Sequence, residues 1–408
     1  MFQDIIEAIK AYLNIHPDCF PLILSLENHC SIPFQDEIAY QLRFIFGDSL
    51  FIPDESKLNE PLPSPDELKG MVLIKGRRIT DTRDDYCQGS TDYDSDSDDS
   101  EIEQEHIKDI SDREPLSPRS SSGLSRQSST SFSTELSRIT IFHGVRIPSF
   151  GAGMEMSKDC MLSIDESKAR KYCKHEGEQM KWIKYNQTHM SRVYPSAKRM
   201  DSSNFSPVTA WSTGCQMAAL NIQTGDKWRL INDGRFRQNG SCGYVLKPPN
   251  LLSSSISIPD PVTLKVRVLS GCCLPKVKVD GNGEIINPYV SVSVYDIPFN
   301  GGKELISYGH TQTVSRNGYN PIWAQEGYFK FYVVNPDVAM LQFSLWDKDV
   351  TSSDRLVASS SIPINCVREG YRSVHLFDEH YKRNGVLECS SLLVEVKLRK
   401  STQEVKMW

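Results

Sequence analysis

The hydrophobic pattern of the first 80 residues alternates between helical and strand-like segments. Residues 1–19 carry apolar side chains at helical spacing, and residues 20–26 form a short apolar run that is typical of a strand buried on both faces. Residues 35–46 return to helical spacing, and residues 70–75 predict a second buried strand. Strand, helix, strand is the order of an α/β fold, in which polar chemistry gathers at the carboxyl ends of parallel strands.

The rest of the chain divides into two further patterns. Residues 165–174 predict a charged helix, and residues 219–222 and 244–246 resemble buried strands. From about residue 261, apolar and polar positions alternate with period two between Gly, Pro, Asn and Asp turns. The alternating segments are residues 263–269, 289–294, 329–333, 341–345 and 392–398. This second pattern predicts an antiparallel β-sandwich.

A polar segment separates the two α/β-like stretches. Residues 80–134 lack apolar periodicity and run from Asp-rich to Ser-rich. Such a composition predicts a disordered linker, because it cannot bury enough surface to offset its ordering entropy. Between residues 81 and 114, fourteen acidic residues stand against three basic ones, a local charge of −11 within a chain of net charge −6. The remainder, at +5, could approach an anionic surface if the acidic block moves aside.

Composition places the chain among cytosolic globular proteins. Its 408 residues predict two or three domains, and 39% hydrophobic with 24% charged residues is an ordinary globular balance. Asp4, Glu7 and Lys10 interrupt the first ten residues, which therefore lack the basic-then-apolar layout of a secretory signal. The eleven cysteines contain no paired CxxC, so we expect reduced thiols without a disulfide framework or a zinc site.

Two groups of motifs resemble the X and Y boxes of eukaryotic phosphoinositide-specific phospholipase C. Leu-Ser-Leu-Glu-Asn-His-Cys at residues 24–30 and Leu-Ile-Lys-Gly-Arg-Arg at 73–78 resemble the later part of the X box. Ser-Arg-Val-Tyr-Pro at 191–195 and Gly-Tyr-Val-Leu-Lys-Pro at 243–248 resemble the Y box. The order X box, acidic linker, Y box and a sandwich similar to a C2 domain is that of the family, and the chain most resembles its delta-like branch.

The resemblance implies four regions. They are the C-terminal part of the X box at 1–79, the linker at 80–134, the Y box at 135–254 and the C2 domain at 255–400. The implied fold is an α/β TIM-like barrel, with X and Y as its halves and its first strands missing, beside an all-β C2 sandwich.

The resemblance also implies an activity. Its members hydrolyse phosphatidylinositol 4,5-bisphosphate to inositol 1,4,5-trisphosphate and diacylglycerol with Ca²⁺, in intracellular signalling. We therefore expect a cytoplasmic, monomeric protein that lies peripherally on membranes, with phosphoinositide lipid and an anionic membrane surface as partners and no nucleic acid.

Three X-box residues match functional positions of the family, and a fourth, His29, does not. Glu27 matches a calcium-ligand glutamate, although it could simply cap a strand or pair with a lysine. Lys75 and Arg77, two residues apart, match the positions that hold the 4- and 5-phosphates of the inositol ring, although basic strand ends are usually just solvated. His29 does not match a catalytic histidine, and we predict a hydrogen-bonded core histidine.

Three Y-box residues match the head-group site. Ser163, Arg192 and Tyr194 match residues that hydrogen-bond the head group, grip a phosphate and pack on the inositol ring. Residues 163–166 also read S-x-x-E, a capping box that would explain Ser163 without any substrate.

The sandwich contains a candidate C2 calcium loop. Asp347, Asp349 and Asp354 cluster after a predicted strand, and Asn287 stands where the family usually has an aspartate. Asp280 is a further candidate ligand. The alternative is a C2 domain that serves only as a structural brace.

The start of the chain departs from the family. Residues 1–19 read as one amphipathic helix, where the family has a His-Asn pair, a Glu-x-Asp calcium pair and a second histidine. Both catalytic histidines therefore lack a counterpart, the active-site calcium ligands reduce to Glu27, and we predict that the chain as given does not catalyse. The alternative function is a catalytically inactive module that binds phosphoinositide or membrane.

Overall fold

The computed structural model describes residues 1–79, 132–253, 257–276, 285–299, 301–323, 327–349 and 353–400. The acidic block and Asp280 lie outside these residues, as does all of the predicted linker before residue 132. Thr134, predicted to belong to the linker, begins a helix.

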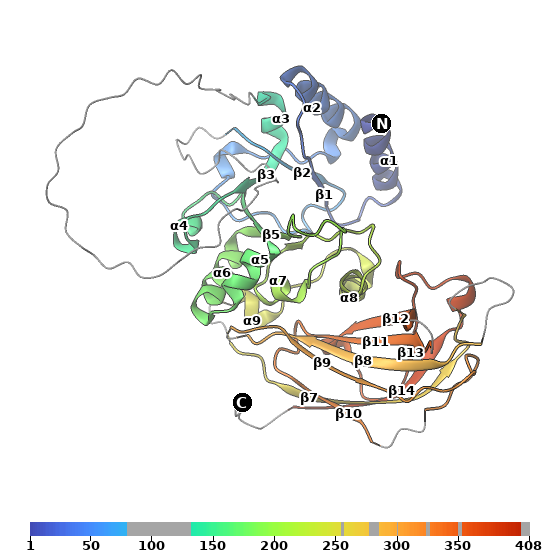
Figure 1. The fold of residues 1–408 in the computed structure, drawn as a ribbon. Coiled ribbons are helices and arrows are strands. Elements are labelled where there is room, and N and C mark those ends of the chain that lie inside the picture. The colour runs from blue at the N-terminus through green and yellow to red at the C-terminus, as the bar shows by residue number, and fades with distance from the viewer. Residues whose placement is uncertain are drawn as a thin grey trace, which may run out of the picture.

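Six parallel strands form one curled sheet, and they occur in the sheet in the same order as in the chain (Figure 1). They are β1 Leu22–Ser25, β2 Val72–Gly76, β3 Thr140–Val145, β4 Cys160–Asp165, β5 Met190–Tyr194 and β6 Met217–Ala218. Because each strand pairs with the next in parallel, all carboxyl ends lie at one edge of the sheet. This confirms the predicted TIM-like barrel architecture, with β1 and β6 as the outermost strands of the described sheet.

The helices in the described part of the chain are α1 Phe2–Ile15, α2 Ile32–Phe46, α3 Thr134–Ile139, α4 Phe150–Met154, α5 Glu166–Cys173, α6 Glu176–Thr188, α7 Val208–Ser212, α8 Lys227–Phe236 and α9 Pro249–Leu252. Among them, α1, α2, α3, α5 and α6 pack on the outer face of the sheet. Short 3₁₀ turns are η1 Gly47–Ser49, η2 Glu55–Lys57, η4 Gln238–Ser241, η5 Ile364–Cys366 and η6 Gly385–Leu387. Val72 and Ile74 of β2 pack on α1, α2 and α3, whereas Leu162 and Ile164 of β4 pack on α5 and α6.

Alternate residues of the same strands point to the inner face of the sheet. Ile23, Leu73, Met161, Met190 and Met217 form one apolar cluster there. Since strand side chains alternate between faces, the residues two positions further along β1, β2, β4 and β5 also face inward, nearer the carboxyl edge. The polar residues that the sequence singles out occupy these positions.

The antiparallel sandwich consists of two four-stranded sheets, as predicted. Their orders are β10-β7-β14-β13 and β12-β11-β8-β9. The strands are β7 Val262–Cys272, β8 Pro288–Asp296, β9 Leu305–His310, β10 Phe329–Val333, β11 Met340–Asp347, β12 Arg355–Pro363, β13 Gly370–His375 and β14 Ser391–Lys400. Inward-facing Val, Leu and Phe side chains from both sheets form a single core between them.

The barrel and the sandwich share a second core. Helix α8 lies against β12 and β11 of the sandwich (Figure 1). Ile231 of α8 and Trp211 belong to the same buried cluster as Tyr295 and Met340 of the sandwich. The buried guanidinium of Arg235 donates a hydrogen bond of 3.0 Å to the carbonyl of Asp337. The two parts are therefore packed as one body.

Two segments that were predicted to be strands are not. Residues 244–246 are irregular, and residues 219–222 follow β6 rather than forming a strand. Leu246 is exposed, so this apolar segment is not a buried one. A strand needs a neighbour with which to pair, and in the described part of the chain β6 pairs with β5 alone.

A buried carboxyl at the end of β8 gives a pH prediction. Asp296 accepts hydrogen bonds from the backbone N–H groups of Val334 at 2.6 Å, Ile297 at 2.8 Å and Asn335 at 3.2 Å. Burial outweighs these bonds and raises the pKa of Asp296 from 3.8 to about 6. The folded chain thus holds this proton more tightly than the unfolded chain, so the group costs stability above pH 6 and the cost falls as pH is lowered.

We expect Asp296 to change the free energy of unfolding by about 1 kcal/mol between pH 7 and pH 5, in favour of the lower pH. Urea denaturation of the native chain and of Asp296→Asn at both pH values measures this change. The free energy of unfolding should rise by about 1 kcal/mol more in the native chain than in the variant, whose amide cannot titrate. An equal pH dependence in both proteins would contradict it.

Candidate functional site at the carboxyl edge of the sheet

The inner face carries two polar clusters at the carboxyl edge, with β3 between them. Register pairs Ser25 of β1 with Lys75 of β2, and Ser163 of β4 with Arg192 of β5. Each of these residues lies two positions beyond an apolar inner residue of its strand. On each of these four strands, the inner-face residues thus change from apolar to polar toward the carboxyl end.

The cluster on β1 and β2 centres on Lys75. Its Nζ donates a hydrogen bond of 3.3 Å to Ser25 Oγ. Arg77 follows on the same strand path and is partly buried. Glu27 lies two residues beyond the end of β1 with its side chain 56% exposed, and its Oε1 lies 3.3 Å from Nε2 of His29.

The prediction of a core histidine at position 29 is wrong. The side chain of His29 is 70% exposed. The residue follows the end of β1, where the chain has left the sheet, so no layer covers the imidazole. Its hydrogen-bonding contact is with Glu27, a predicted site residue, which places His29 beside the candidate site.

The cluster on β4 and β5 centres on Arg192. Its guanidinium donates a hydrogen bond of 3.4 Å to Ser163 Oγ and lies 5.2 Å from the ring centroid of Tyr194. The contact over the aromatic face holds the guanidinium in a cation–π arrangement. The cluster combines a cation, a hydroxyl and a flat ring, which suits a phosphorylated ring compound.

The capping-box interpretation of Ser163 is wrong. Ser163 lies within β4, and Asp165 is the N-cap of α5, accepting hydrogen bonds from the backbone N–H of Ser167 at 2.6 Å and of Lys168 at 3.1 Å. The strand runs two residues further than the S-x-x-E pattern allows. The hydroxyl of Ser163 is therefore available to Arg192.

Glu166 is a supporting residue that sequence reasoning missed. Its buried carboxylate accepts hydrogen bonds from Arg170 and Arg199 and one of 3.2 Å from the backbone N–H of Ser196. Ser196 and Arg199 belong to the segment just after Tyr194. The carboxylate therefore fastens the exit of β5 to the first turn of α5, and no sequence signal beyond its position at a helix start would have shown this.

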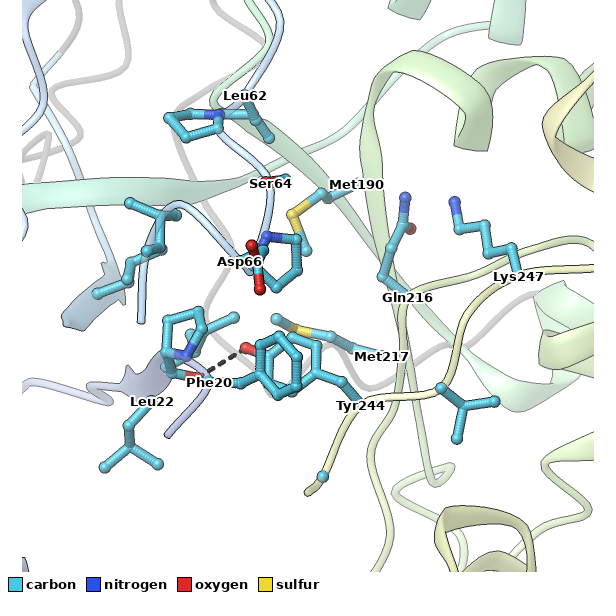
Figure 2. Close-up of a pocket in the computed structure, with 18 of the residues that line it drawn as sticks. Phe20, Leu22, Leu62, Ser64, Asp66, Met190, Gln216, Met217, Tyr244 and Lys247 are labelled. Atoms are coloured by element: carbon cyan, nitrogen blue, oxygen red, sulfur yellow. Dashed lines mark hydrogen bonds between the residues drawn. The ribbon is translucent and has the colours of Figure 1, made fainter. Parts of the chain in front are cut away.

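A large, mostly apolar cavity is lined by residues of the X and Y halves, among them Leu22, Met190 and Met217 (Figure 2). It has a volume of about 1690 Å³ and is lined by inner-face residues that include Ile23, Leu73, Met190 and Met217. None of the predicted site residues lines it. The O–H of Tyr244 donates a hydrogen bond of 2.7 Å to the carbonyl of Pro21, and this contact links the start of β1 to the segment after α8 across the cavity.

Three cations, Lys158, Arg235 and Lys247, are among the residues that line this mostly apolar space. Lys247 donates a hydrogen bond of 2.6 Å from Nζ to the carbonyl of Asn186, and burial lowers its pKa to about 8. The carboxyl-edge clusters are thus polar and partly exposed, whereas this cavity is mostly apolar.

The described residues alone do not complete a calcium site at the sheet edge. Calcium takes six to eight oxygen ligands, and Glu27 is the predicted carboxylate ligand there. Glu27 would hold one coordination position, and water, substrate or other groups would have to supply the rest.

The predicted calcium loop of the sandwich brings its residues together but already engages two of its acids. Asp354 accepts hydrogen bonds from the O–H of Tyr289 at 2.8 Å and from Nζ of Lys348 at 3.1 Å, and these contacts lower its pKa. Asp349 pairs with Arg355 at 3.3 Å. A calcium ion would have to displace these cations.

The other two loop residues contact each other. Asp347 accepts a hydrogen bond of 2.8 Å from the backbone N–H of Asn287, and Oδ1 of Asn287 accepts one of 2.9 Å from the backbone N–H of Arg316. The arrangement is compatible with the brace interpretation, and calcium binding by this loop stays a prediction.

A buried ionic cluster lies away from both sites. Arg78, one residue after Arg77, pairs with Asp159 at 2.9 Å. His143 and Cys160 place ligand atoms near the same carboxylate, and the three acidic, imidazole and thiol atoms lie within 4.8 Å of one another. The guanidinium already neutralises Asp159, so we interpret the cluster as a structural ion pair.

Profile comparison identifies the parts of the chain. Residues 1–78 match the phosphatidylinositol-specific phospholipase C X domain, residues 136–250 match the Y domain of the same family, and residues 262–378 match the C2 domain. The chain belongs to the phosphatidylinositol-specific phospholipase C family. The cluster around Lys75 thus lies in the X domain, and the cluster around Arg192 lies in the Y domain.

Relatives agree with this assignment. The chain is 34% identical over 426 residues to the 1-phosphatidylinositol 4,5-bisphosphate phosphodiesterase delta-4 of Xenopus laevis, covering 99% of the chain and 52% of that protein. It is 32% identical over 410 residues to the mouse protein named inactive phospholipase C-like protein 2, covering 97% of the chain and 34% of that protein. The chain spans about half the length of the delta relatives that it matches.

A solved structure shares the fold. L. pealei PLC21 superimposes with a TM-score of 0.75 at 24% identity, over 99% of the chain and 48% of that structure. Within the described residues, no helix has the length and apolar character required to cross a membrane.

Proposed function

We propose that this chain contributes the phosphoinositide-binding face of a phospholipase C that hydrolyses phosphatidylinositol 4,5-bisphosphate to inositol 1,4,5-trisphosphate and diacylglycerol with Ca²⁺ in intracellular signalling. The observation that carries the proposal is the placement of Lys75 and Arg192, one from each domain, on one face and at one edge of the same sheet. Membership of the family and the names of the delta relatives support it.

Each polar residue has a role that its chemistry allows. Lys75 and Arg77 would neutralise two ring phosphates, because cations with exposed N–H groups form charge-assisted hydrogen bonds to phosphate oxygens. Arg192 would hold a third anionic oxygen while Ser163 donates or accepts beside it. Tyr194 offers a flat face to the inositol ring, and Glu27 would supply one oxygen ligand to calcium.

The sandwich would bring this face to its substrate. We propose that the C2 domain contacts an anionic membrane surface from the cytoplasmic side, that the chain acts as a monomer, and that weak calcium binding at Asn287, Asp347, Asp349 and Asp354 contributes when Lys348 and Arg355 are displaced. Phosphorylated lipid supplies the anionic charge.

A second candidate function is an inactive phosphoinositide-binding module. One observation favours it. A relative of 32% identity is named inactive phospholipase C-like protein 2. Such a module would use the same cations without turnover.

Binding of the free head group tests the shared part of both functions. We expect Arg192→Met to weaken inositol 1,4,5-trisphosphate binding by about 10- to 100-fold in isothermal titration calorimetry, because one charge-assisted contact is removed. Lys75→Met should weaken it similarly. The matched control is Lys198→Met, an exposed cation just beyond β5 that should leave binding unchanged. Equal losses in all three variants would contradict the site.

Hydrolysis then separates the two functions. Vesicles containing phosphatidylinositol 4,5-bisphosphate and Ca²⁺ should yield soluble inositol trisphosphate if the chain is catalytic. Head-group binding without release supports the inactive module, and absence of both binding and release contradicts both functions.

A further inference from the structure

The outer face of one sandwich sheet carries a row of lysines. Lys265 of β7 lies directly opposite Lys330 of β10 on one side and directly opposite Lys397 of β14 on the other. The neighbours of Lys265 on β7, Leu264 and Val266, are buried in the core between the two sheets. Because strand side chains alternate between faces, the three lysines point outward, side by side across three strands.

Two arginines extend this row along the strands. Arg267 lies two positions beyond Lys265 on β7, and Arg399 lies two positions beyond Lys397 on β14. Both arginines therefore share the outward face with the lysines. We call these five cations the basic face, which consists of Lys265, Arg267, Lys330, Lys397 and Arg399.

The carboxylates beside the basic face are already engaged. Glu395 lies 2.5 Å from the guanidinium of Arg267 and 3.5 Å from Nζ of Lys397. Glu369 accepts a hydrogen bond of 2.7 Å from a backbone N–H of β14. Within the described residues, the ion pairs on this face thus engage Arg267 and Lys397 but not Lys265, the centre of the row.

The lysine row costs stability in the free chain, because like charges directly opposite each other in a sheet repel. Protection of a sheet edge against pairing would explain Lys330, since β10 is an edge strand. It does not explain Lys265, because β7 has a neighbouring strand on both sides. An anionic partner over Lys265 would relieve this repulsion, so the face is complementary to negative charge.

The basic face points away from the barrel. Helix α8 packs on β12 and β11 of the other sheet, and Figure 1 shows β7, β10 and β14 on the far side of the sandwich. A membrane bound there would be separated from the barrel by both layers of the sandwich, although the proposed function places the lipid head group on the barrel. Exposed Tyr332 and Tyr371 lie on the same outer face and offer the aromatic surface that is enriched at protein interfaces.

We propose that the basic face binds an acidic segment of a partner protein, with carboxylates over Lys265 and Lys330. Neighbouring strands lie about 4.8 Å apart, and side chains three or four residues apart on a helix lie about 5–6 Å apart, so acidic residues at helical spacing match neighbouring lysines. This interface goes beyond the proposed lipid chemistry. The choice of a protein over a membrane rests on the proposed function.

Fluorescence anisotropy of a fluorescein-labelled oligoglutamate peptide tests the basic face. The full chain should bind the peptide saturably and more weakly as the salt concentration rises. Lys265→Glu should weaken binding by about tenfold, because it reverses the charge at the centre of the row. The same variant should raise the thermal midpoint, because two repulsive cross-strand pairs become attractive. Loss of folding cannot produce both results.

Matched controls separate the face from net charge and from the head-group site. Lys171→Glu, at an exposed position of α5, makes the same change in net charge and should leave peptide binding unchanged. Arg192→Met should also leave peptide binding unchanged, and Lys265→Glu should leave inositol 1,4,5-trisphosphate binding unchanged. Failure of the head-group site is thereby distinguished from failure of the basic face.

Three outcomes would overturn the proposal. One is equal peptide affinity in the native chain and Lys265→Glu, and another is equal weakening by Lys171→Glu and Lys265→Glu. The third is that Lys265→Glu abolishes binding to phosphatidylserine vesicles and leaves peptide binding intact, which would identify a membrane as the partner of this face.

Discussion

Replacing Asp159 with alanine should destabilise the chain by about 3–5 kcal/mol, because it removes the near counter-charge of a buried guanidinium and leaves only the exposed carboxylate of Glu55, 3.8 Å from Arg78. The side chains of Arg78 and Asp159 are 6% and 2% exposed, and they lie 2.9 Å apart. Water cannot replace the lost carboxylate at that depth. Urea denaturation followed by far-ultraviolet circular dichroism measures the change.

Two control proteins make this expectation specific. Asp66→Ala breaks an exposed pair with Lys69 and should change stability by less than about 1 kcal/mol. The double variant Arg78→Met/Asp159→Leu removes both charges and should recover most of the loss. If the single and double variants were equally unstable, packing rather than charge would explain the effect.

Replacing Gly234 with alanine should cost about 3 kcal/mol by separating α8 from the sandwich. A Cβ at this position would lie 2.5 Å from the carbonyl oxygen of Ser361 in β12. That oxygen is backbone in a paired strand and cannot turn aside, so the helix must move and loosen the contacts of Ile231 and Arg235.

The same substitution elsewhere provides the control. A Cβ at Gly177, in α6, meets no atom within 4 Å, and Gly177→Ala should stabilise the chain by about 0.5–1 kcal/mol. Thermal unfolding should show a second, separate transition in Gly234→Ala, because the barrel and the sandwich no longer unfold together. A single transition at the native midpoint would contradict the expectation.

The sequence predicted only part of the elements whose burial appears in their own residues, since strands β3, β4 and β5 of the parallel sheet were not predicted. The two X-domain strands and five strands of the sandwich are apolar or cleanly alternating, and the structure confirms them. Strand β12 was missed because its buried centre is Ser359, Ser360 and Ser361, which pair across the sheet rather than provide apolar contacts. Residues 244–246 gave the opposite error. They are apolar and were predicted to be a strand, but they form no strand in the structure.

The candidate site was predictable in its residue types but not in its supports. Alternation predicted that Lys75 and Arg77 share a side, but nothing in the run showed that Arg78 would turn to the opposite face and pair with Asp159, 81 positions away. Likewise, Glu166 is bound by Arg199 from beyond the next strand. Long-range ion pairs leave no periodic trace in a sequence.

The shared core of α8 and the sandwich has a mechanical consequence. Because α8 and the sandwich share buried side chains, the barrel and the sandwich should tilt together. If the C2 domain docks on a membrane as proposed, that docking would also set the angle at which Lys75 and Arg192 face the membrane.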